Sequence, residues 1–268
     1  MRLIKTTLGE KRPKCSAGVL LGRFLPVGAL AGMVGCWWLA TAMFAVDPFF
    51  VPSPIDVADA FFAAPGYLLQ ETAATAGITL AGFGLATASG LIVAALIATS
   101  RTVERAVMPI LVALHSVPKV SVAPLLVVWL GFGAQPKIAM VMVISFFPIM
   151  LAAAAGLTST PRELAELAHS LSASRWQKFV KIRFPWALPQ FLVGLKAGVT
   201  LAVIGAVVAE LASSNSGLGT VILTAGTTAD TPTAFAAISL LALMSTSLFF
   251  GLVAIERSML AWASETTA

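Results

Sequence analysis

The chain has 268 residues, of which 58% are hydrophobic and 11% are charged, and its formal net charge at pH 7 is +5. So few charged residues cannot cover the surface of a water-soluble protein of this length. Several uncharged apolar runs reach the ~20 residues that a helix needs to cross the hydrocarbon core of a bilayer. The composition therefore excludes a soluble globular protein and predicts an integral membrane protein with several spans.

Six apolar runs are expected to cross the membrane as helices, because they lack the two-residue alternation of barrel strands. In chain order they cover 26–46, 73–99, a span within 106–130, then 138–157, 191–211 and 234–254. The predicted fold is an all-α polytopic membrane protein. It has an N-terminal tail over 1–25, one transmembrane domain over 26–257, and a short C-terminal tail over 258–268.

The first run could be read as a signal peptide, because basic residues precede it. The uncharged stretch that follows Arg23 is 23 residues long. The apolar core of a signal peptide is shorter, roughly 7–15 residues. We therefore favour an uncleaved first transmembrane helix.

The orientation of the spans follows from where lysine and arginine lie. They gather in the N-terminal tail, after the second and fourth runs, and after the sixth run. The segments 47–72 and 212–233 hold acidic residues and no base, and Lys137, between the third and fourth runs, is the exception. Basic residues are retained on the cytoplasmic side. Both termini are therefore expected in the cytoplasm.

A polar, strongly basic loop over 158–190 joins the fourth and fifth runs. Thr160-Pro161-Arg162-Glu163 at its start has the pattern of a capping box with proline at the first helical position. An apolar stripe at helical spacing then predicts an amphipathic helix, made of Leu164, Leu167, Ala168 and Leu171.

The sequence Ser172-Ala173-Ser174 interrupts this helix, and a second short helix with Trp176, Phe179 and Val180 on one side is expected before Pro185. From the pattern alone, two interpretations stand side by side. The loop is either an interfacial connector on the lipid headgroups or a docking surface for a soluble partner. The acidic Glu163 and Glu166 at its start do not suit an anionic membrane surface.

The loop resembles the cytoplasmic loop of permease subunits of bacterial ATP-binding-cassette (ABC) importers. That motif reads Glu-Ala-Ala, three residues, Gly, nine residues, Ile, one residue and Leu-Pro. Here Glu166-Leu167-Ala168, Ile182 and Phe184-Pro185 take the corresponding places. Leu167 replaces an alanine, and Ser172 replaces the glycine. If the turn needs a positive φ, serine costs about 1 kcal/mol more than glycine there.

From about Val51 onward, the chain is similar to the nitrate/sulfonate/taurine branch of these permeases. The matching stretches are VPSPIDV, SVPKVSVAPLLVVWLGFG from Ser116, FFPIM from Phe146, GLKAGVTLAVIGAVVAEL from Gly194, and SGLG from Ser216. Their order and spacing agree over roughly 200 residues. The agreement therefore extends well beyond the loop.

The resemblance implies a permease of the bacterial inner membrane that works as a dimer, either of two copies or with a close paralogue. The first loop helix would be the coupling helix that docks into a cytoplasmic ATPase dimer, which binds the ATP. A periplasmic or lipid-anchored binding protein would deliver a small organic solute of sulfonate, carboxylate or vitamin-precursor type. The coupling residues would be Glu163, Leu164, Glu166, Leu167, Ala168, Leu171 and Ser172.

The sequence has no ATP-binding or metal-binding motif, which agrees with a permease whose ATPase is a separate subunit. It has no phosphate-binding G-x-x-x-x-G-K-[ST] motif, and its two histidines, His115 and His169, have no cysteine or carboxylate cluster at metal-ligand spacing. We expect a non-catalytic subunit without a cofactor, and no nucleic-acid partner. A gradient-driven secondary transporter is the main alternative, and a membrane-embedded enzyme is a weaker one.

Two ionisable residues are candidates for the solute pathway or a gate, because charge within a membrane is costly. Lys119 lies between Pro118 and Pro124, in a stretch expected to be a broken helix. It is either deep in the third span or at the cytoplasmic interface, if 106–116 is a surface helix. Glu210 closes the fifth run. It either gates the outer mouth, contacts the binding protein, or is a solvated helix end.

Overall fold

The computed structural model describes residues 16–44, 46–213 and 216–260, and these form helices joined by short turns. The helices are α1 (Ser16–Met43), α2 (Pro54–Ala63), α3 (Pro65–Thr99), α4 (Arg101–His115), η1 (Lys119–Val122), α5 (Ala123–Leu130), α6 (Ala134–Thr158), α7 (Arg162–Ser170), α8 (Arg175–Lys178), η2 (Phe179–Arg183), α9 (Phe184–Ser213), α10 (Leu218–Thr227) and α11 (Thr231–Met259). The all-α prediction is confirmed. Most of the predicted 1–25 and 258–268 tails lies outside the described residues.

Within the described residues, four helices are long and apolar enough to cross a membrane: α3, α6, α11, and the helix that runs from Trp176 to Ala212. The number is five if α4 and the η1–α5 pair, which are bent by 79° at the break between them, are counted as one span. Pro118 lies in that break, as expected where a backbone N–H is missing, and Pro124 lies beyond it in the first turn of α5. The count of six spans stays a prediction.

Two short helices, α2 and α10, lie in segments that the sequence interpretation treats as outer loops. Each has 10 residues, too few to cross a bilayer. At the start of α2, Ser53 Oγ accepts the N–H of Asp56 (3.3 Å) and the Asp56 carboxylate accepts the N–H of Ser53 (2.8 Å). This reciprocal cap fixes the first turn of α2.

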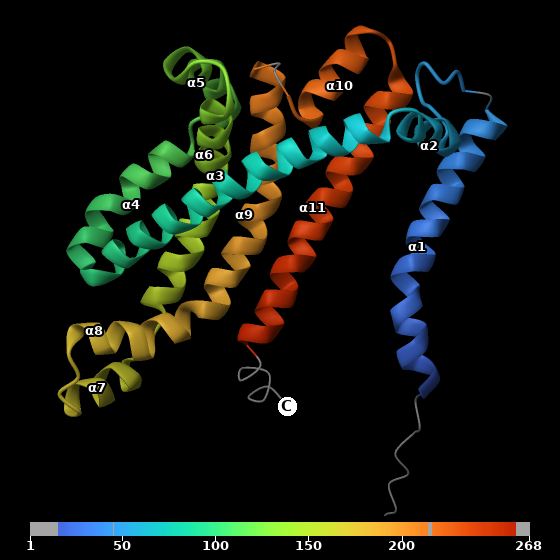
Figure 1. Ribbon diagram of the computed structural model, residues 1–268. Helices are drawn as coiled ribbons and strands as arrows, with labels where there is room; N and C mark the ends of the chain where they lie inside the picture. The colour runs from blue at the N-terminus through green and yellow to red at the C-terminus, as the bar shows by residue number, and fades with distance from the viewer. Residues whose placement is uncertain (1–15, 45, 214–215, 261–268) are drawn as a thin grey trace, which may run out of the picture.

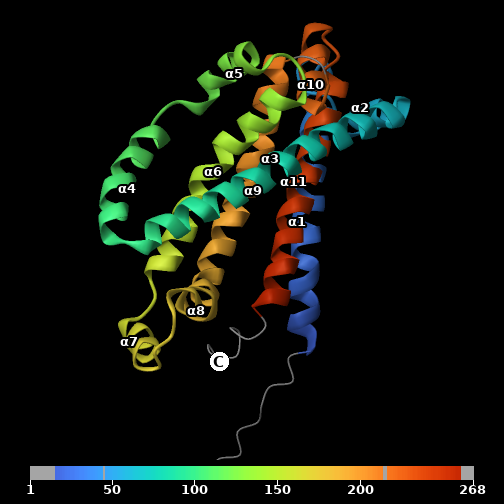
Figure 2. The same ribbon diagram turned by 60° about the vertical axis from the view of Figure 1, so that its left-hand side comes forward.

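The centre of the bundle is α6, which packs between α3 and α9 (Figures 1 and 2). Glycines permit the close approach. A Cβ built on Gly82 of α3 would lie 2.5 Å from Val141 Cβ, and one on Gly205 of α9 would lie 2.9 Å from Val141 Cα. Val141 of α6 thus sits between two glycine-lined helices, an arrangement that small residues allow in membrane bundles.

Replacing Gly205 with alanine is therefore expected to destabilise the bundle by about 1–3 kcal/mol, because the added methyl meets backbone that cannot rotate away. Gly77→Ala, on α3, is the matched control, since a Cβ there has no heavy atom within 4 Å. It should be neutral or stabilise by up to about 1 kcal/mol. Thermal unfolding of the purified variants in detergent measures both. Equal effects of the two substitutions would contradict this account of the packing.

The bundle has two distinct ends (Figure 1). At one end lie α7, α8, the start of α1 and the end of α11; at the other lie α5 and α10 (Figures 1 and 2). The described chain thus starts and finishes on the same side as the basic loop, as the distribution of lysine and arginine predicts. The end with α7 and α8 is called the loop end below, and the end with α5 and α10 the α10 end.

Candidate functional site

The first loop helix, α7, ends in a Schellman turn. The N–H of Ala173 donates to the carbonyl of Ala168 (3.0 Å), and Ser172 between them has a φ of +53°. A hydrogen bond from an N–H to the carbonyl five residues earlier, with a left-handed residue just before the donor, commonly ends a helix, and that residue is usually glycine. The positive φ expected at the glycine position of the motif is therefore present, although serine stands there.

Serine is strained in this conformation, so Ser172→Gly is expected to stabilise the turn by about 1 kcal/mol. Amide hydrogen exchange at Ala173 should slow by about fivefold in the variant. Ser170→Gly is the matched control, because Ser170 is the last residue of α7 and glycine weakens a helix relative to other residues. Faster exchange in both variants would show that Ser172 is not under strain.

Several side chains of α7 and its turn are exposed, among them Glu163, Glu166 and Leu171, the last with 73% of its surface accessible. Leu164 is partly buried and Ala168 is 2% exposed, so Ala168 faces the protein's own interior. The side chain of Leu167 lies outside the described part of the structure. The exposed face of α7 is thus a mixture of carboxylates with an apolar residue at its end.

The predicted capping box at the start of α7 is wrong. Thr160 Oγ1 is buried without a hydrogen-bond partner, so it does not accept the N–H of Glu163. A box is present one helix later, where Ser174 Oγ accepts the N–H of Gln177 (3.2 Å) and Gln177 Oε1 accepts the N–H of Ser174 (2.9 Å). The cap therefore starts α8, which follows the Schellman turn directly.

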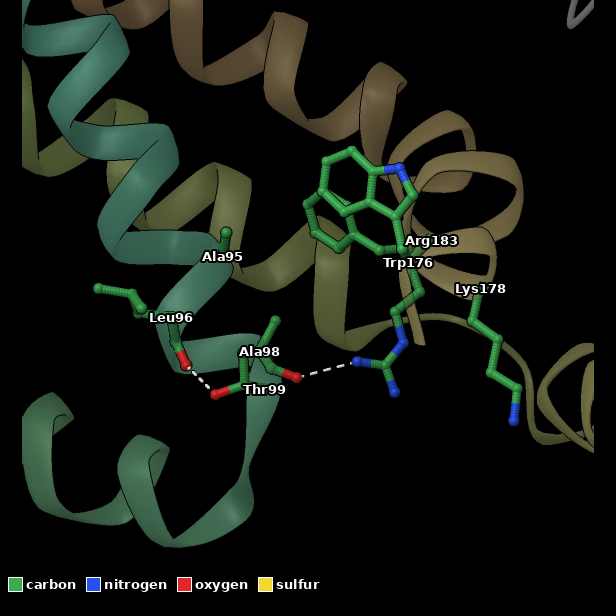
Figure 3. A pocket seen from close by; sticks show the side chains of 8 residues that line it. Ala95, Leu96, Ala98, Thr99, Trp176, Lys178 and Arg183 are labelled. Atoms are coloured by element: carbon green, nitrogen blue, oxygen red, sulfur yellow. Dashed lines mark hydrogen bonds between the residues drawn. The ribbon is translucent and has the colours of Figure 1, made fainter. Parts of the chain in front are cut away.

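The predicted second helix does not end before Pro185. It passes from α8 through the π-helical turn η2 into α9, and only there does Pro185 occupy the first turn of the long helix. Arg183, in η2, donates from Nη1 to the carbonyl of Ala98 at the end of α3 (2.9 Å; Figure 3). The second helix of the loop is thereby continuous with one membrane helix and bonded to another.

At the α10 end, a buried polar cluster gathers side chains from three long helices around the start of α10. Thr75 Oγ1 of α3 donates to Glu210 Oε1 of α9 (2.8 Å). The backbone N–H of Gly219 donates to Glu210 Oε2 (2.8 Å), and that of Leu218 donates to Thr75 Oγ1 (2.8 Å). The N–H of Gly217 donates to the carboxylate of Glu71. Three successive N–H groups at the N-terminus of α10 are thus satisfied by other helices.

Lys137 of α6 completes the cluster. Its ammonium donates to the carbonyl of Ser216 (2.7 Å) and to Ser216 Oγ (3.3 Å), just before α10. Within the described residues it forms no direct ion pair with Glu71 or Glu210. The side chain is 1% exposed, so Lys137 is not part of an outer loop, as its place between two predicted spans suggested. It belongs to the first turn of α6.

Glu210 is 0% exposed, so the interpretation of this residue as a solvated helix end is wrong. Sequence reasoning missed its partner Thr75 and the second carboxylate of the cluster, Glu71, and gave Lys137 no role. A signal for the two charged residues did exist, because Glu71 and Lys137 each adjoin an apolar run. In the structure, the glycines of SGLG leave no room for a side chain, since a Cβ on Gly219 would lie 2.8 Å from Glu210 Cβ.

Lys119 lies at the corner between α4 and α5. Its ammonium donates to the carbonyl of His115 (2.9 Å), lies 3.2 Å from His115 Nδ1, and sits 5.2 Å from the ring centroid of Phe147 in α6. Lys119 is partly exposed. The lysine thus closes the last turn of α4 and contacts α6, and it makes no hydrogen bond to the cluster around Glu210 among the described residues.

The sequence profile described as "binding-protein-dependent transport system inner membrane component" matches residues 86–261. The chain belongs to this family. The permease of the riboflavin transport system of Chloroflexus aurantiacus is 37% identical over 240 residues, covering 89% of each chain. The taurine transport system permease of Escherichia coli is 30% identical over 248 residues, covering 90% of each chain. The family member described here is therefore an ABC importer permease of the sulfonate/taurine branch, a multi-pass protein of the inner membrane.

The fold of this family member is also found among solved structures. An inward-facing structure of the MetNI methionine ABC transporter superposes with a TM-score of 0.66 at 20% sequence identity. It covers 74% of this chain and 98% of the matched chain. At that level of identity the likeness concerns the fold of ABC importer permeases.

Proposed function

We propose that this permease forms one half of the solute pathway of an ATP-driven importer and couples it to a cytoplasmic ATPase through α7. The observation that carries the proposal is the loop end of the bundle. There α7 and the turn that follows it present exposed Glu163, Glu166 and Leu171. The continuous helix through η2 and the bond from Arg183 to Ala98 support a mechanical link from this surface to α9 and α3.

In this proposal, the loop end faces the cytoplasm, where both termini also lie, and the α10 end faces the periplasm. ATP binds to the separate ATPase dimer, and this subunit performs no chemistry. Closure of the ATPase dimer would move α7 and switch the pathway between inward- and outward-facing states. A second permease copy, or a close paralogue, supplies the other half of the pathway, and a binding protein delivers solute at the α10 end.

The solute is proposed to be a small organic molecule of sulfonate, carboxylate or vitamin-precursor type. Relatives with 37% and 30% identity are permeases for riboflavin and for taurine, and the first of these favours a vitamin-type solute. Lys119 is proposed as a pathway residue, because its partly exposed ammonium lies at the break between α4 and α5. Glu210 is proposed to hold the outer end of the pathway in shape through α10.

The proposal is tested by affinity purification of the full-length protein from native membranes in mild detergent, with identification of what co-purifies. We expect a stoichiometric ATPase that carries the phosphate-binding motif, and its loss when Glu166 and Leu167 are both replaced. Uptake of radiolabelled riboflavin and taurine by the complex in proteoliposomes, with ATP inside, then tests the solute class. A folded protein without any ATPase, whose transport stops when the proton gradient is collapsed, would favour a secondary transporter.

A further inference from the structure

A groove of about 740 Å³ opens at the loop end of the bundle, between the last turns of α3 and the segment that runs from α8 into η2 (Figure 3). One wall is apolar and includes Ala95 and Leu96 of α3. The other wall is basic and aromatic, with Trp176, Lys178 and Arg183. None of the lining residues is acidic. The groove therefore combines positive charge with an apolar surface at the end of two membrane spans.

The two cations of the groove have hydrogen-bonding capacity left for a ligand. Arg183 uses one N–H on the carbonyl of Ala98, and a guanidinium has five N–H donors in all. Among the residues that the structure describes, the ammonium of Lys178 makes neither a hydrogen bond nor an ion pair. Arginine and lysine together are a typical donor set for a phosphate group. A ligand of this groove is therefore expected to carry negative charge.

An exposed apolar row leads away from the groove along α3. Leu96 lines the groove and is followed by Ile92 and Leu85, one and three turns further into the span. These residues have exposed fractions of 56%, 61% and 53%. Residues four and seven apart lie on the same face of a helix. A hydrocarbon chain that starts at the groove can therefore follow this face toward the centre of the membrane.

We propose that this groove binds the headgroup of an anionic phospholipid. Its phosphate lies between Lys178 and Arg183, Trp176 lies at the level of the headgroups, and one acyl chain packs along Leu96 and Ile92. Basic pockets between transmembrane helices at the membrane surface bind anionic lipid headgroups, and tryptophan is enriched at that depth. The proposal goes beyond the proposed function, because it requires only that α3 and α9 cross the membrane.

The position of the site gives the lipid a mechanical role. The groove is bounded on one side by the helix that continues from the loop into α9, and on the other by the end of α3. A bound lipid would bridge the two, with its phosphate on Lys178 and Arg183 and its acyl chain on Leu96 of α3, in addition to the bond from Arg183 to Ala98. Anionic lipid would thus stabilise the arrangement in which the loop is held against α3.

The test is a lipid titration of the full-length protein, purified together with any subunits that remain bound, followed by native mass spectrometry. Phosphatidylglycerol is the anionic probe and phosphatidylcholine the zwitterionic one. We expect one phosphatidylglycerol to bind at least about fivefold more tightly than phosphatidylcholine. Lys178→Gln should weaken phosphatidylglycerol binding about fivefold.

Lys181→Gln is the matched control, because it removes one positive charge from the same segment at an exposed residue that does not line the groove. It should change the affinity by less than about twofold. Ala95→Phe fills the groove without changing its charge and should weaken binding as Lys178→Gln does. This second variant keeps the test independent of any effect of Lys178 on folding.

Three results would overturn the proposal. Equal affinities of the unaltered protein for the two lipids would remove the charge selectivity. Equal losses in Lys178→Gln and Lys181→Gln would show attraction by the net charge of the loop and not by a site. Displacement of the lipid by an excess of inorganic phosphate would assign the groove to a soluble anion. None of these outcomes depends on ATP-driven transport, so the proposed function is tested separately.

Discussion

Glu210→Ala is expected to lower the free energy of unfolding by about 3–5 kcal/mol, because it breaks a buried network of charged and polar groups. The substitution leaves the hydroxyl of Thr75 and the N–H of Gly219 without their acceptor, in a place without access to water. It also removes one of the two nearby carboxylates whose negative charge acts on the buried ammonium of Lys137 without a direct ion pair. Glu210→Gln keeps the shape and should cost less, about 1–3 kcal/mol.

The control for this prediction is Glu256→Ala. The Glu256 carboxylate accepts from Lys196 Nζ at 2.9 Å, but each of these side chains is 22% exposed. Such a partly solvated pair contributes about 1 kcal/mol or less. Equilibrium unfolding in mixtures of detergent and denaturant compares the variants. If Glu210→Ala costs no more than Glu256→Ala, the cluster does not hold α10 in place.

Under the proposed coupling role, replacing Glu166 with alanine or Leu167 with aspartate should lower ATP-driven uptake by at least about tenfold, while the protein still inserts and folds. Glu166 is exposed on α7, so its removal leaves no buried group unpaired within the subunit. A polar partner in the ATPase would lose its acceptor, and such losses at interfaces are large enough to reduce binding by that factor. A charge at Leu167 acts by desolvation in the same contact.

Asp59→Ala serves as the control, since Asp59 is an exposed carboxylate of α2, outside the loop end. Uptake and the amount of co-purified ATPase are measured in the same membranes. We expect both to fall in the α7 variants and neither to change in the control. Unchanged uptake in both α7 variants would exclude α7 as the coupling helix. Normal ATPase binding with lost uptake would place the defect after docking.

How well the loop was predicted depended on how local each feature is. The motif position raised the question of a positive φ at Ser172, and the structure has one there, because a helix stop is decided within six residues. The predicted capping box at Thr160 was wrong, although the residues from Thr160 to Glu163 match the motif. The reciprocal hydrogen bonds of a capping box form instead between Ser174 and Gln177. Whether a cap forms depends on how the chain enters the helix, and sequence spacing does not show this.

The buried cluster shows the opposite case. Each of its charged residues was visible in the sequence as an unusual charge beside an apolar run, yet Glu210 was compatible with a solvated helix end and Lys137 with an outer loop. Only the packing of α3 and α9 against α6, through Gly82 and Gly205, brings Glu71, Lys137 and Glu210 to one place. Because a buried charge without hydrogen-bond partners is costly, these three side chains are stable only in an arrangement that gives each of them partners.

By itself, the sequence determined the class of protein, the helical fold and the family. These follow from hydropathy, charge distribution and motif spacing, which are properties of contiguous residues. The tertiary structure decided that the SGLG segment is held by three other helices, that α8 continues into α9, and that Lys178 and Arg183 face an apolar wall of α3. Contacts between distant segments depend on how the helices pack, and packing is fixed by the fit of whole surfaces rather than by any local pattern.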